Sequence, residues 1–116
     1  MKIQQNIISK CQAAYYFLTG IWPILHMHSF IEITGAKTDL WLVKMVGLLT
    51  VCIAITLFYA SRHHAKTALI LGVSSAASYA IIDVYYATAN IIPGIYLADA
   101  VLEVIIIILL LVSQRK

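Results

Sequence analysis

Five ionisable side chains lie inside long apolar stretches of this sequence, where they could carry out chemistry. They are His26, Lys44, Asp83, Asp99 and Glu103. A charged group inside hydrocarbon is costly unless it is paired or hydrated, so such residues usually face the interior of a helix bundle. Carboxyl, imidazole and ammonium groups gathered there could bind a small ligand or a cation, or transfer protons.

Aromatic residues recur beside these groups at helical steps of three or four residues, as Trp22 does before His26 and Tyr79 does before Asp83. Residues at these steps share one face of a helix. We therefore expect a polar cavity within the membrane, in the half of the bundle that faces the periplasm. The predicted ligand-binding residues are His26, Lys44, Asp83, Asp99, Glu103, Tyr79, Tyr86, Tyr96 and Trp22.

The charges of these residues do not balance. Asp83, Asp99 and Glu103 face at most Lys44 and His26. Three unpaired negative charges cannot all persist in a pocket of low dielectric, so some carboxyls are protonated, His26 is charged, or a cation is bound. Two simpler interpretations stay open: buried ion pairs that fix helix register, and a Lys44 side chain that extends outward to the headgroups.

Other chemistry is also open. A carboxyl such as Glu103 or Asp83 could act as general acid with His26 as its partner, on a lipid-like or isoprenoid substrate, so the sequence leaves open whether the protein is an enzyme. His26 and a carboxyl could ligate Zn or Mn, but no H-E-x-x-H or other tight signature occurs. We therefore predict no metal site, and the sequence identifies no cofactor.

The composition indicates which elements must position these residues. Of 116 residues, 62% are hydrophobic and 11% charged, far from the balance of soluble domains. The apolar residues form four runs of membrane-spanning length, 12–28, 40–60, 65–89 and 95–112. The sequence thus predicts an all-α membrane protein of one domain, 1–116, with four transmembrane helices in an up-down-up-down bundle with short loops. The first run is expected to be an uncleaved helix rather than a signal peptide.

The basic residues predict the orientation of these spans. Six of the eight lysines and arginines fall on the side that holds both termini and the connection between the second and third runs. The positive-inside rule then places both termini in the cytoplasm of a bacterium, with the protein in its inner membrane. The partner is the lipid bilayer, and the basic charge requires no nucleic acid.

Two local patterns refine the elements. Ser29 and Glu32 fit a capping box, so the first helix is expected to break near His28 and restart as a short segment that ends at Gly35. The third run carries a small-residue ladder, which allows close helix packing. Its residues are Ala68, Gly72, Ala76 and Ala80. The ladder packs either within the bundle or against a partner, which leaves open a homodimer or a structural subunit of a larger membrane complex.

About a third of the chain carries a resemblance. The stretch "YYFLTGIWPILHMHSFIEITGAKTDLWLVKMVGLL", residues 15–49, has an aromatic-Leu-Thr-Gly start, a Trp-Pro pair, a His-containing helix end and Thr-Gly-x-Lys-Thr-Asp-x-Trp-Leu-Val. It resembles short bacterial four-helix membrane proteins, themselves largely uncharacterised, and more distantly DoxX-type membrane proteins. The resemblance implies four helices in a bacterial inner membrane and no particular activity.

Overall fold

The structure is a computed structural model that describes residues 2–35 and 40–114. Over these two ranges the chain forms five α-helices and no β-strand. The helices are α1 (Lys2–Leu25), α2 (Met27–Thr34), α3 (Leu40–His63), α4 (Ala65–Thr88) and α5 (Ile95–Ser113). The predicted all-helical class is therefore confirmed for the described part of the chain.

The last three long helices match the predicted runs, and their ends differ from the prediction by at most three residues. These helices, α3, α4 and α5, are also the ones whose length and apolar composition suit a membrane span. The structure is thus compatible with a membrane protein.

Helix α1 is longer than the first apolar run. It begins at Lys2, ten residues before the predicted start at Gln12. The added turns contain Gln5 and Ser9, which are buried against the other helices. Gln5 gains hydrogen-bond partners in the Ala65 carbonyl and the Gln114 side chain. Tertiary packing of this kind can stabilise helical turns that an apolar sequence pattern does not predict.

The helix break lies two residues earlier than predicted. α1 ends at Leu25, and His26 caps α2 by accepting a hydrogen bond from the Ser29 backbone N–H. The predicted capping box is wrong, because Ser29 lies inside α2 rather than at its N-cap. The predicted end at Gly35 is confirmed; its φ of 100° is a conformation that favours glycine.

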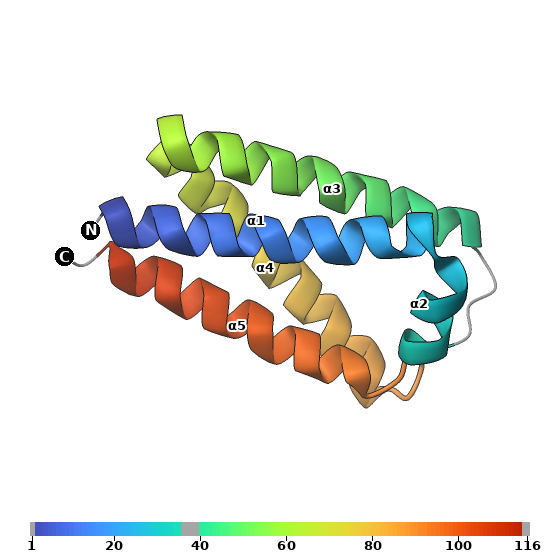
Figure 1. Cartoon of the computed structure of the whole chain (residues 1–116). Helices are drawn as coiled ribbons and strands as arrows, with labels where there is room; N and C mark the ends of the chain where they lie inside the picture. Colours follow the sequence, from blue (N-terminus) through green and yellow to red (C-terminus); the bar gives the residue numbers. More distant parts are fainter. Residues whose placement is uncertain (1, 36–39, 115–116) are drawn as a thin grey trace.

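Helix α1 lies at the centre of the molecule and contacts every other helix (Figure 1). α3 and α5 flank it, and α4 crosses behind it at a steep angle (Figure 1). The chain doubles back along the molecule, so the two ends of the described chain lie at the same end and α2 lies at the other (Figure 1). Each carboxyl-bearing helix therefore packs against α1.

Small and polar residues make up most of the buried interior, and large apolar residues cover much of the outside. The ladder of Ala68, Gly72, Ala76 and Ala80 is buried, so it packs within the bundle. Large side chains such as Leu18 and Ile105 are exposed. In a soluble protein, large apolar side chains are mostly inside, so this arrangement of buried and exposed residues is the reverse. It suits helices that pack closely through small residues and expose leucine and isoleucine to lipid.

Candidate functional site

Three carboxyl groups lie together where the last turns of α4 meet the first turns of α5, and we call Asp83, Asp99 and Glu103 the carboxyl cluster. Asp83 comes from α4, whereas Asp99 and Glu103 lie four residues apart on one face of α5. Asp99 is the neighbour whose charge acts on both other carboxyls. The structure thus brings together three of the nine residues that sequence spacing predicted to line one cavity.

Two tyrosines of α1 cover the carboxyl cluster. The Tyr15 hydroxyl donates a hydrogen bond to Asp99 Oδ1. The Tyr16 hydroxyl donates to Glu103 Oε1 across 2.6 Å, and both partners are 1% exposed. Hydrogen bonds to a carboxylate are about twice as strong as those between neutral groups, so these contacts tie α1 to α5.

Tyr79 extends this polar group toward α3. Its ring packs edge-on against the Tyr16 ring, with 5.2 Å between centroids. Its hydroxyl shares a hydrogen bond with Thr50 Oγ1 of α3. Tyr79 is therefore half-buried next to the carboxyl cluster without bonding to it.

The negative charge of the cluster has no basic counterpart in the described ranges. The one ion pair there is on the surface, between His28 Nε2 and Glu32 Oε2 at 3.4 Å. Asp83 is 6% exposed, and its Oδ2 atom has no hydrogen-bond partner among the described residues. A buried carboxyl oxygen without a donor is costly, so it needs an explanation beyond packing.

His26 lies away from the cluster, at the corner where α1 gives way to α2. Its ring is exposed, and Nδ1 lies 2.7 Å from Ser29 Oγ. Trp22 belongs to the same corner, since its Nε1–H donates to Ser29 Oγ across 2.9 Å and its ring packs edge-on against Phe30. Sequence spacing predicted that His26 faces the carboxyls; its neighbours are instead these corner residues.

The other predicted residues are dispersed. Lys44 is exposed on α3 and forms no ion pair with a described residue. Tyr86 packs its ring edge-on against Tyr85 near the end of α4. Tyr96 is half-buried in the first turn of α5. Of the nine predicted residues, the three carboxyls and Tyr79 are thus the ones that group together.

Sequence reasoning missed the buried face of α1. Gln5, Ser9, Gln12 and Tyr16 recur at steps of four, three and four residues, and all are buried. Gln12 Nε2 donates to Tyr16 Oη at 3.2 Å and to the Gly72 carbonyl at 3.0 Å, which links this face to the carboxyl cluster. The signal was present in the spacing, but the helix face predicted to be polar was the one that carries Trp22 and His26.

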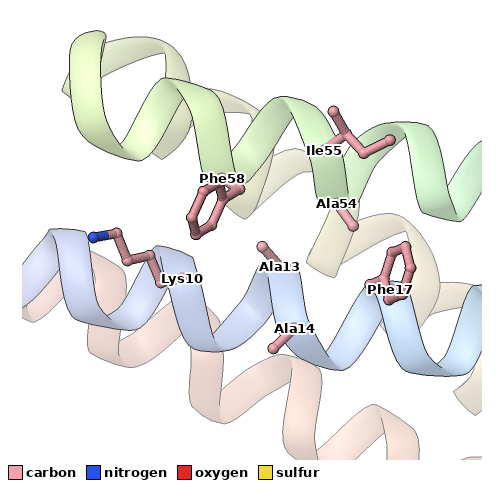
Figure 2. Close-up of a pocket in the computed structure, with 7 residues that line it drawn as sticks. All are labelled: Lys10, Ala13, Ala14, Phe17, Ala54, Ile55 and Phe58. Atoms are coloured by element: carbon pink, nitrogen blue, oxygen red, sulfur yellow. The ribbon is translucent and has the colours of Figure 1, made fainter.

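Two pockets of about 330 Å³ each open on the sides of the bundle. The first lies between α1 and α3, with an alanine floor, the Phe17 and Phe58 rings, and Lys10 at one end (Figure 2). The second lies between the start of α1 and the end of α5. Neither pocket is lined by a carboxyl residue, so a cavity around the cluster stays a prediction.

The chemistry open to the cluster is that of oxygen ligands. Among the described residues, no group of three or more histidine, cysteine, aspartate or glutamate side chains is arranged to hold a metal ion. The three carboxyls of the cluster therefore do not form a metal-ion site by themselves. They lie beside the hydroxyls of Tyr15 and Tyr16, and a small cation bound there would take its oxygen ligands from both kinds of group. In comparisons with known proteins, the chain matches no protein-family model, no curated protein and no solved structure.

Proposed function

We propose that this chain is an integral membrane protein with four spans, in which α1 joins α3, α4 and α5. At a rise of about 1.5 Å per residue, the 24 residues of α1 extend about 36 Å, longer than the hydrocarbon core of about 30 Å. Its Gln5, Ser9 and Gln12 side chains face the bundle interior rather than the outside. Polar residues in a span are tolerated in that position.

The proposed location is a bacterial inner membrane with both termini in the cytoplasm. The support is the positive charge at the end of the molecule where the described chain begins and ends, which includes Arg62 and Lys66 next to the α3–α4 connection. α2 then faces the periplasm, and the carboxyl cluster lies between this face and the bundle centre.

The proposed function is the binding of a small cation by the carboxyl cluster, as part of transport or as an accessory to it. One observation carries this proposal: three carboxyl groups lie together inside the bundle with no basic partner among the described residues. Their mutual repulsion falls when a positive charge binds between them. The free Oδ2 atom of Asp83 is an acceptor for such a cation. An acid–base enzyme gains no comparable support, because His26 contacts Ser29 rather than a carboxyl.

Thermal unfolding of the purified protein in detergent tests this function. Sodium or potassium chloride should raise the unfolding midpoint above that in an equal concentration of a bulky organic-cation chloride. A cation at a hundred times its dissociation constant stabilises the folded state by about 2.7 kcal/mol. Glu103→Gln should abolish this shift, because it removes a charge of the cluster.

The matched control is Glu32→Gln, the same chemical change at an exposed carboxylate of α2. This variant should keep the full cation-dependent shift. Equal shifts in Glu103→Gln and Glu32→Gln, or no shift in the unaltered protein, would contradict cation binding at the cluster.

A further inference from the structure

The buried face of α1 carries polar side chains over its entire first half. These are Gln5, Ser9, Gln12 and Tyr16, which we call the α1 polar line. Burying uncharged polar groups costs free energy unless each group finds hydrogen-bond partners. If these positions served only to pack helices together, alanine or glycine would suffice, as in the buried ladder of α4.

The two ends of the α1 polar line reach different parts of the molecule. Gln5 Nε2 donates to the Ala65 carbonyl, and Gln114 Nε2 donates to Gln5 Oε1, each across 2.6 Å. These contacts lie at the end where the described chain begins and ends (Figure 1). At its other end the line reaches Glu103 through the Tyr16 hydroxyl. It therefore joins the carboxyl cluster to one end of the bundle.

Two polar atoms inside the line lack partners. Ser9 Oγ and Gln12 Oε1 have no hydrogen-bond partner among the described residues, although the two side chains are 0% and 1% exposed. The residues lie one helical turn apart on the same face of α1. Buried polar atoms of this kind are commonly satisfied by water, which needs at least two polar partners in one place. Ser9 Oγ and Gln12 Oε1 are the two polar atoms of the line available to such a water.

Glycine at position 72 lets the backbone of α4 approach Gln12 closely. A Cβ atom there would lie 2.8 Å from Gln12 Oε1 and 3.0 Å from Leu110 Cδ1. Any larger residue would push against the unpartnered oxygen. The backbone of α4 thus approaches the α1 polar line closely without covering its polar atoms with a side chain.

We propose that the α1 polar line, with water between Ser9 and Gln12, carries protons to the carboxyl cluster from the end of the bundle where the described chain begins and ends. The proposal rests on the proposed function, since it takes the cluster as the cation site and names the proton as a cation that reaches it. Asp99, which is half-buried one turn after the start of α5, continues the polar groups toward the opposite end.

The proton transfer balances at Tyr16. The phenol oxygen accepts a proton from a protonated water on the Gln12 side, while its own O–H proton passes to the Glu103 carboxylate. The water chain loses one proton, Glu103 becomes a neutral carboxyl, and Tyr16 ends with the composition it had. The observed hydrogen bond from Tyr16 to Glu103 already has the direction of this step. The bond that Tyr16 accepts from the Gln12 amide transfers no proton and instead orients the phenol oxygen.

Proton flux into liposomes tests the proposal. The purified full-length chain is reconstituted with a pH-sensitive dye in the lumen, and a potassium gradient with valinomycin sets the membrane potential. The unaltered protein should acidify or alkalinise the lumen faster than empty liposomes. Tyr16→Phe and Gln12→Leu should each lower this rate by about tenfold or more, because each removes a group that transfers or orients the proton.

Two control variants make the same chemical changes elsewhere. Tyr59→Phe removes an exposed hydroxyl from α3, and Gln4→Leu removes an exposed amide from α1. Both should keep the flux of the unaltered protein. Ser9→Ala, the mildest change in the line, should fold and lower the flux by a smaller factor, because water can fill the space of the lost hydroxyl.

The results separate the proton path from the cation site. A flux equal to that of empty liposomes, or full flux in Tyr16→Phe and Ser9→Ala, overturns the proton path. If the cation-dependent thermal shift still disappears in Glu103→Gln, the binding site stands without the path. A flux that depends on Tyr16 and Ser9, together with a thermal shift unaffected by Glu103→Gln, supports the path and overturns binding of the alkali cation at the cluster.

Discussion

At the scale of single residues, the three carboxyls of the cluster differ in the hydrogen-bond donors that they contact. Glu103 and Asp99 each accept a hydrogen bond from a tyrosine of α1. Asp83 has no such donor for its Oδ2 atom and lies next to Asp99. A charge buried beside a like charge destabilises the fold, and functional sites often retain groups that stability alone would not favour.

Asp83→Asn should therefore stabilise the folded protein. The change keeps the shape of the side chain, removes repulsion from Asp99 and adds an N–H donor, so we expect a gain of about 1–3 kcal/mol in the free energy of unfolding. The measurement is thermal unfolding in detergent at mildly alkaline pH, without alkali cations. Glu103→Gln should gain less, because it weakens the bond from Tyr16. A loss of stability in Asp83→Asn would show that its carboxylate is satisfied by a partner.

At the scale of helices, the closest approach joins α1 and α3. A Cβ atom on Gly47 would lie 2.5 Å from the Gly20 carbonyl oxygen, and one on Gly20 would lie 2.7 Å from the Gly47 oxygen. Both neighbours are backbone atoms, which cannot rotate away. The two helices must separate to admit any side chain there, and Tyr15, Tyr16 and Thr50 would move with them.

Gly47→Ala should consequently destabilise the protein by about 1–3 kcal/mol, the usual cost of overpacking. Alanine favours the helix more than glycine does, so a loss of stability could not come from helix propensity and would come from crowding. The control is Gly94→Ala, where a Cβ atom meets nothing within 4 Å. Chemical or thermal unfolding in the same detergent compares the two variants. A Gly47→Ala protein as stable as Gly94→Ala would contradict the close crossing.

The helices were more predictable than the contacts of their side chains. Long apolar runs with short polar connections located α3, α4 and α5, because hydrocarbon-length helices leave a strong pattern. The carboxyls of α4 and α5 could be grouped because regular helical spacing fixes their faces. His26 could not be placed, since a break in the helix changes the direction of every residue after Leu25. Gln5 and Ser9 were missed because polar residues before an apolar run look solvent-exposed until tertiary contacts are known.

At the scale of the whole molecule, polarity is inverted relative to a soluble protein. The largest fully buried side chains include Tyr16, Gln12 and Glu103, whereas leucine and isoleucine cover much of the outer surface. An apolar surface of this extent is unfavourable in water and suited to lipid. α1 is the helix around which this polar interior is built, although its composition is the least apolar of the four long helices.

The position of the N-terminus tests whether α1 crosses the membrane. With four spans, both termini lie on the same side, whereas with only α3, α4 and α5 as spans they lie on opposite sides. Green fluorescent protein fluoresces in the cytoplasm but not after it is exported unfolded to the periplasm. It should therefore fluoresce when fused to either terminus in a bacterial host. Alkaline phosphatase, active in the periplasm, should be active when inserted at Gly94, between α4 and α5. Phosphatase activity from an N-terminal fusion, with the C-terminus in the cytoplasm, would remove α1 from the membrane. The α1 polar line would then lie outside the membrane, and it could not carry protons through the bilayer to the carboxyl cluster.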